Sequence, residues 1–151
     1  MNKNYWLFGG HLSIHADEQK TGGTYDMIEG TMQKGMETPL HIHTKYSEHV
    51  YMLEGEIMIY TPEETVVLKP GDDYFIPVNI PHAISPMGEG NNRSLVVAYP
   101  SGFAELIRNV GTADEGTGLP VTEDLDATMQ RFMIATAKIG DKILGPPGTR
   151  L

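Results

Sequence analysis

Between about residue 24 and residue 100, short runs rich in Val, Ile, Tyr and Met alternate with turn-forming Gly, Pro, Asn and Asp residues. The clearest runs are TYDMIEGTM, EHVYMLEG, EIMIYT, TVVLKPG, DYFIP, HAISP and RSLVVAYP. Runs of this length and spacing, without helical periodicity, are typical of strands in an all-β sandwich or barrel. The pattern therefore predicts an all-β fold, an antiparallel β-barrel or double-stranded jelly roll, for this part of the chain.

The sequence after Pro100 predicts helices instead. GFAELIRNVG is expected to form a short helix, and TEDLDATMQRFMIATAKIG a longer one with Thr122 as its N-cap and Glu123 and Asp124 in the first turn. Four residues recur at helical spacing and are expected to share the face that lies on the barrel: Leu125, Met129, Phe132 and Thr136.

These two regions are expected to form one domain. A chain of 151 residues is about the size of a single ordinary domain, and it can bury a core without help from disulfides or metals. We therefore predict one domain over residues 1–151, with a β core at about 24–100 and a helical C-terminal extension at about 101–151.

The stretch GMETPLHIHTKYSEHVYMLEG, residues 35–55, concentrates the side chains that could carry chemistry. His41 and His43 are two apart in an expected strand, so they project from the same face. After a turn over residues 44–47, Glu48 can face the same interior. The strand period then puts Val50 and Met52 on the side of Glu48, and puts His49, Tyr51 and Leu53 on the other side.

A fourth candidate ligand is His82, which follows the conformationally restricted segment Pro77–Pro81. Three imidazoles and the carboxylate of Glu48 would form a nitrogen and oxygen site for one divalent transition metal: iron, nickel, manganese, cobalt, copper or zinc. The residues alone do not choose among these metals. They also leave open the alternative that His41 and His43 are a solvated or hydrogen-bonded pair on a sheet face.

The spacing of these residues resembles that of the cupin superfamily. Its first motif, G-x5-H-x-H-x(3,4)-E-x6-G, is matched by Gly35, His41, His43, Glu48 and Gly55. The resemblance implies that the two histidines and the glutamate are metal ligands. It also implies that Glu48 is the base that takes a proton from a bound enol or phenol.

The second cupin motif, G-x5-P-x-G-x2-H-x3-N, is matched by Gly71, Pro77 and His82, and the resemblance makes His82 the remaining ligand. Asn79 stands where the family usually has glycine, and Pro86 where it usually has asparagine. Asparagine is among the residues that best tolerate a positive φ, so Asn79 is expected to keep the turn.

Within the superfamily the chain looks most like the single-domain, quercetin dioxygenase-like cupins. Three outer stretches carry this part of the resemblance: YWLFGG at residues 5–10, PSGF at 100–103 and GPP at 145–147. The implied function is a metal-dependent dioxygenase that acts on an enolisable or phenolic, quercetin-like small molecule.

Two alternatives have the same metal site. A redox-neutral sugar isomerase or epimerase would use the metal to polarise a carbonyl group and a carboxylate to shuttle a proton. A non-catalytic protein that binds a metal or small molecule is the other alternative, because a fold does not determine a function.

Composition excludes other classes. The chain has no cysteine, which removes thiolate nucleophiles, Cys-ligated zinc, iron–sulfur clusters and disulfides. Its formal net charge of -9 argues against nucleic acid as a partner. Neither a signal peptide nor a membrane span is evident, so a cytoplasmic protein is expected. Open sheet edges need cover, so a homodimer is expected too.

Overall fold

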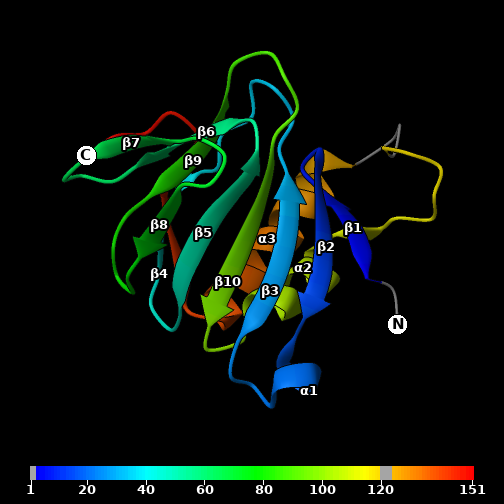
Figure 1. Ribbon diagram of the computed structural model, residues 1–151. Coiled ribbons are helices and arrows are strands. Elements are labelled where there is room, and N and C mark those ends of the chain that lie inside the picture. The colour runs from blue at the N-terminus through cyan, green and yellow to red at the C-terminus, as the bar shows by residue number, and fades with distance from the viewer. Residues whose placement is uncertain (1–2, 120–123) are drawn as a thin grey trace.

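The computed structural model describes residues 3–119 and 124–151, and within these residues the chain forms twelve strands and three helices. Seven strands form one antiparallel sheet, which lies in front of the helices in Figure 1. Their order is β11 (Thr112–Ala113), β1 (Asn4–Leu7), β2 (Gly10–Ala16), β3 (Asp26–Thr31), β10 (Arg93–Tyr99), β5 (Ser47–Glu54) and β8 (Asp73–Ile76).

The other strands form a second layer. β12 (Asp141–Gly145) pairs with β4 (Leu40–His43), and β6 (Glu56–Tyr60) lies between β7 (Thr65–Leu68) and β9 (Ala83–Met87). An isolated bridge between His41 and His82 joins the two parts of this layer. The predicted all-β class, a jelly roll of antiparallel sheets, is confirmed.

The β region extends beyond the predicted core at both ends of the chain. β1 and β2 precede residue 24 and form a hairpin in which Leu7 pairs with Gly10. Its two central residues, Phe8 and Gly9, both have positive φ, which suits the twist of a two-residue hairpin. At the other end, β12 belongs to the second layer, so the predicted helical extension also contains a strand of the barrel.

The interior of the barrel is aliphatic. Along β5 the side chains of Glu48, Val50 and Met52 are buried, whereas His49 and Tyr51 are exposed, and this confirms the predicted alternation. Beyond Glu48, the buried cluster consists of Val50, Met52, Ile57, Ile59, Leu68 and Ile76. Met52 therefore belongs to the packed core, which is the more common role of a strand methionine.

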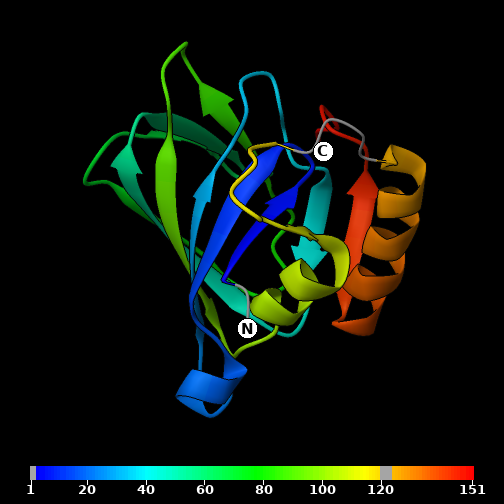
Figure 2. The ribbon, with the colours of Figure 1, turned by 90° about the vertical axis from the view of Figure 1, so that its right-hand side faces the viewer.

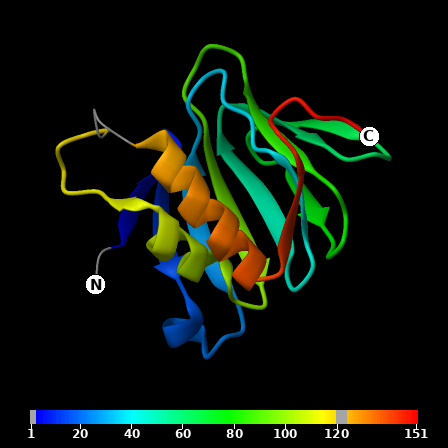
Figure 3. The ribbon, with the colours of Figure 1, turned by 180° about the vertical axis from the view of Figure 1, so that it is seen from behind.

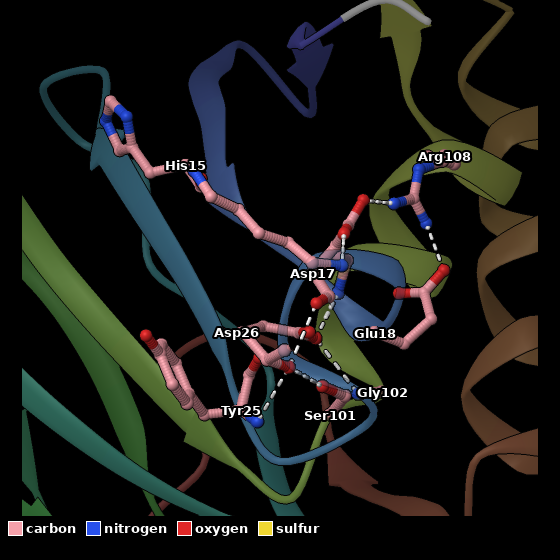
Figure 4. Close-up of polar contacts among 11 residues, drawn as sticks. His15, Asp17, Glu18, Tyr25, Asp26, Ser101, Gly102 and Arg108 are labelled. Carbon is pink, nitrogen blue, oxygen red and sulfur yellow. Dashed lines mark hydrogen bonds and ion pairs between the residues drawn. The ribbon is translucent and has the colours of Figure 1, made fainter.

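Helix α2 (Phe103–Val110) buries Ala104, Leu106, Ile107 and Val110. Its N-cap is Gly102, which has no side chain to cap the helix. The buried carboxyl group of Asp26 in β3 replaces that cap, because its Oδ2 accepts from the backbone N–H groups of Gly102 and Ala104, each at 2.9 Å (Figure 4).

The other end of α2 is fixed to the short helix α1 (Glu18–Thr21) by Arg108. Its guanidinium group donates to the carboxylates of Asp17 and Glu18, as Figure 4 shows. Asp17 is also the N-cap of α1, since it accepts from the backbone N–H of Lys20. Together with Asp26, these contacts place α2 against the large sheet.

Helix α3 (Leu125–Lys138) packs on α2 and leads directly into β12, as Figures 2 and 3 show. Its N-cap is Asp124, whose side chain accepts from the backbone N–H of Ala127. The predicted cap, Thr122, lies outside the described residues. Met129 is 43% exposed, so its predicted place on the covered face is wrong. Thr136 is buried as predicted, and Thr128 and Ala135, which were not assigned to that face, are buried too.

No helix in the described part of the chain combines the length and the hydrophobicity that a membrane span needs.

Candidate metal centre

Three histidines converge inside the barrel. His41 and His43 come from β4, and His82 lies immediately before β9. Their ring centroids are 4.7 Å apart for His41 and His43, 4.2 Å for His41 and His82, and 5.0 Å for His43 and His82. One ring nitrogen from each lies within 4.8 Å of the others, which is the spacing of a group that can hold a metal ion.

Each imidazole is oriented by a hydrogen bond on its Nδ1. The Nδ1 of His41 lies 2.7 Å from the carbonyl oxygen of Pro39, and that of His82 lies 2.9 Å from the carbonyl oxygen of Ile80. The Nδ1 of His43 lies 2.8 Å from Oδ1 of Asp141. Because all three partners accept, each Nδ1 carries the proton and each Nε2 is left as the nitrogen available to a metal.

The Nε2 atoms of His43 and His82 are buried, and neither makes a hydrogen bond of good geometry among the described residues, although the carboxylate of Glu48 lies nearby. A buried polar atom without a well-formed hydrogen bond costs free energy, and a bound cation would remove that cost. Three imidazole nitrogens beside a carboxylate are also donors that suit a divalent transition metal. The residues present therefore fit a metal ion.

Glu48 completes the group from β5. Its carboxyl group is buried, with Oε1 3.1 Å from Nε2 of His43 and Oε2 3.6 Å from Nε2 of His82. The structure thus brings together all four residues that the sequence predicted: His41, His43, Glu48 and His82. It places them at one point of the interior, where His43 is buried and His41 is partly buried, rather than on a solvated sheet face.

The charges at this point are set by burial and by the neighbouring groups. Burial by itself would raise the pKa of Glu48, but His43 and His82 hold it well below its ordinary value. Burial by itself would lower the pKa of His43, but Glu48 and Asp141 outweigh it and raise that pKa to about 9. Burial, together with repulsion from the other two imidazoles, lowers the pKa of His41 to about 3.

These pKa shifts describe the site without a metal. Glu48 is then a carboxylate paired with a protonated His43, while His41 is neutral. Since only a neutral imidazole can bind a metal, loading the site must release the proton of His43.

Two supporting residues were not predicted from the sequence. Asp141 holds His43, and it lies in β12, which was not expected to be part of the barrel. Tyr46 is buried and stacks on the ring of His43, with centroids 4.3 Å apart. No spacing in the sequence links Asp141 to His43, whereas Tyr46 lies in the predicted turn of the first motif and could have been found there.

Two residues differ from the second family motif, Asn79 and Pro86. Asn79 has a φ of 66°, so it adopts the left-handed conformation predicted for it. Its N–H donates to the carbonyl oxygen of His43 at 2.8 Å, which ties the second motif to the first. Pro86 lies in β9, opposite Ile57 of β6.

The remaining histidines lie elsewhere. His11 is paired with Asp114 at 3.0 Å, and His15 lies 3.8 Å from Glu29. His49 is on the exposed side of β5, as predicted, where its Nε2 lies 2.5 Å from Asp73.

Comparison with known proteins agrees with this fold. The family model of the cupin domain matches residues 28–98. Among curated proteins, the chain is 27% identical to quercetin 2,3-dioxygenase of Bacillus subtilis over 107 residues, which are 71% of this chain and 32% of that protein. It is 32% identical over 79 residues to an uncharacterized protein of Methanocaldococcus jannaschii, covering 52% of this chain and 63% of that one. The chain thus spans less than two thirds of the length of either curated relative.

Solved structures support the fold. A predicted oxalate decarboxylase from Thermotoga maritima aligns with a TM-score of 0.59 and 20% identity, over 66% of this chain and 93% of that chain. An RmlC-like cupin from Shewanella frigidimarina aligns with a TM-score of 0.57 and 19% identity, over 67% and 86% of the two chains. Residues 28–98 thus match the cupin domain, and the sheet topology and these likenesses show that the chain has the cupin fold.

Proposed function

We propose that the protein is a metal-dependent dioxygenase that acts on an enolisable or phenolic small molecule. The observation that carries the proposal is the convergence of three oriented imidazoles on one buried, ionised carboxylate. The similarity to quercetin 2,3-dioxygenase, over 71% of the chain, supports the oxidative reaction class.

In this proposal His41, His43, His82 and Glu48 hold one divalent transition metal. When bound, such an ion acts as a Lewis acid that lowers the pKa of a coordinated hydroxyl group and prepares the substrate for reaction with O2. The Nδ1 hydrogen bonds to Pro39, Ile80 and Asp141 keep the imidazoles in place before the metal arrives.

Glu48 has the second role, as the base. A carboxylate has two oxygens, so one can remain with the metal while the other accepts the proton of the enol or phenol. The low pKa of Glu48 means that its carboxyl group is ionised at neutral pH, the form in which it can act as a base. Along β5, Glu48 shares its buried side of the strand with Val50 and Met52.

Elemental analysis of protein purified without added metal, followed by O2-uptake assays on a panel of flavonols, catechols and β-dicarbonyl compounds, tests the proposal. We expect about one transition-metal ion per chain, and O2 uptake that depends on both metal and substrate. A stoichiometric metal without O2 uptake on any member of the panel would overturn the dioxygenase function while leaving the metal site standing.

A double variant, His41→Ala with His43→Ala, is the control for both measurements. It should lose the metal and the O2 uptake while keeping the wild-type circular dichroism spectrum, because the aliphatic core rather than the metal holds a domain of this size. Retention of the metal by this variant would refute the ligand assignment.

A further inference from the structure

The candidate metal centre contains one contact that reaches outside the cupin core. Nδ1 of His43 and Oδ1 of Asp141 are 2.8 Å apart, and both side chains are almost fully buried. The other two imidazoles are held by backbone carbonyl groups of their own local segments, at Pro39 and Ile80. His43 is therefore the one member of the three that depends on a carboxylate from a distant part of the chain.

The contact is built into the sheet. β12 pairs with β4 in antiparallel register, with Asp141 directly opposite His43. Directly opposite residues point to the same face of a sheet, so the register itself brings the two side chains together. One residue of slip would turn Asp141 to the other face and remove the contact.

The second carboxylate oxygen of Asp141 also accepts a hydrogen bond. The hydroxyl group of Tyr46 donates to Oδ2 at 3.3 Å, and the ring of Tyr46 stacks on the imidazole of His43 with an interplanar angle of 26°. The imidazole is thus fixed at its edge by a carboxylate and on its face by an aromatic ring. Both restraints keep its Nε2 directed toward Glu48, 3.1 Å away.

The turn before β12 fixes where Asp141 begins the strand. Gly140 has a φ of +85°, and a Cβ at this position would lie 2.7 Å from Oγ1 of Thr44. The hydroxyl group of Thr44 donates to the carbonyl oxygen of Gly140 at 2.5 Å, so the residue after His43 holds the residue before Asp141. Helix α3 ends at this turn, so the position of the helix affects where Asp141 lies relative to His43.

We propose that Asp141 is a positioning residue of the metal centre, so that the C-terminal strand β12, which lies outside residues 28–98, completes a site whose ligands all come from the cupin core. This inference rests on the proposed metal-binding function. A carboxylate that accepts from Nδ1 orients the ring and strengthens Nε2 as a donor, and the loss of such a partner typically weakens metal binding about 10- to 100-fold.

The test is the affinity of the metal-free protein for Co²⁺, measured by competition with a chelator, together with the visible absorption spectrum of bound Co²⁺. Asp141→Asn should lower the affinity about 10- to 100-fold and change the Co²⁺ spectrum, because the ring of His43 is no longer held in the same way. Asp141→Glu keeps a carboxylate and should recover part of the affinity.

The matched control is Asp73→Asn. It makes the same chemical change in a His–Asp pair on the exposed side of β5 and β8, where Asp73 lies 2.5 Å from His49. This control should leave both affinity and spectrum as in the wild type. Wild-type affinity and spectrum in Asp141→Asn would overturn the inference and leave the metal site intact, whereas absence of Co²⁺ binding by the wild type would overturn the proposed function itself.

A measurement on the metal-free wild type does not depend on how well the variants fold. An imidazole N–H donated to a buried carboxylate should give a far-downfield, slowly exchanging proton resonance in the NMR spectrum. It should carry a coupling to nitrogen in protein labelled with 15N-histidine, and it should persist in Asp73→Asn. Absence of this resonance from the wild type would overturn the positioning role, whatever the metal does.

Discussion

A Cβ atom added to Gly55 would lie 2.2 Å from the carbonyl oxygen of Asn91, a backbone atom of the loop between β9 and β10. Gly55 also has a φ of +70°, which disfavours any residue with a side chain. The second glycine of the first cupin motif is therefore required by a close approach between two loops, independently of metal chemistry.

Gly55→Ala should lower the free energy of unfolding by about 2 kcal/mol or more, because the strain of a positive φ is added to a backbone clash. Gly35→Ala is the matched variant: its φ is +79°, but its Cβ would meet nothing within 4 Å. That change should cost only about 1 kcal/mol. Equilibrium unfolding in urea measures both, and equal losses would show that the contact with Asn91 does not matter.

Glu48→Gln tests the base. Glutamine has the size of glutamate and keeps one oxygen acceptor, but it cannot take the proton that an ionised carboxylate accepts. We expect turnover per bound metal to fall about 100-fold or more while most of the metal is retained. The same change at the exposed Glu54 should alter neither quantity. If metal content falls and turnover per remaining metal does not, Glu48 is a ligand only.

Asp26→Ala should destabilise the attachment of α2 to the large sheet. It leaves the backbone N–H groups of Gly102 and Ala104 without their acceptor, at a cost of about 1–3 kcal/mol. Asp124→Ala removes the cap of α3 on the surface and should cost about 1 kcal/mol. Thermal unfolding followed by circular dichroism compares the two, and a smaller effect at Asp26 would contradict the role assigned to it.

Lowering the pH should detach residues 146–151 from the rest of the domain before the barrel itself unfolds. The hydrogen bond from Arg150 is the main cause that lowers the pKa of Glu37 below its ordinary value of 4.5, and a bond from the N–H of Gly148 adds to it. A depressed pKa in the folded state means that Glu37 contributes stability above its ordinary pKa. This contribution is lost as the pH falls through the lower, folded value.

Amide hydrogen exchange of Leu151 measures this release, because its N–H donates to the hydroxyl oxygen of Tyr60 at 2.8 Å. Protection should be present at neutral pH and should fall as the pH drops below about 4.5. Glu37→Gln should lose protection at neutral pH, and Glu89→Gln, which removes an exposed partner of Lys34, should not. Protection that is unchanged in Glu37→Gln would rule out the role of this ion pair.

The part of the site that the sequence predicted is the part that local spacing determines. His41 and His43 lie on β4 and Glu48 on β5, two strands that follow each other in the chain across a short turn but lie in different layers, so strand alternation turns all three side chains toward the interior between the layers. The conformation of Asn79 follows from the tolerance of asparagine for positive φ. His82 was a candidate because it follows the restricted segment Pro77–Pro81, and the resemblance to cupins supported it as the fourth ligand; it lies just before β9.

The parts that were missed depend on pairing between distant segments. The pairing of β12 with β4 and of β1 with β2 and β11 is not encoded in any periodicity, so neither the full extent of the sheets nor Asp141 could be derived. Met129 was assigned to the covered face of α3 by helical spacing. The contacts of α3 with α2 and β12 cover Thr128 and Ala135 instead and leave Met129 exposed.

The pairing of β12 with β4 also sets the order in which the centre can be assembled during translation. The chain leaves the ribosome from its N-terminus, so His41, His43, Glu48 and His82 all emerge before Asp141 is synthesised. Until β12 is in place, His43 lacks the acceptor for its Nδ1. The contact that orients His43 is therefore completed only when the last strand of the domain has been synthesised.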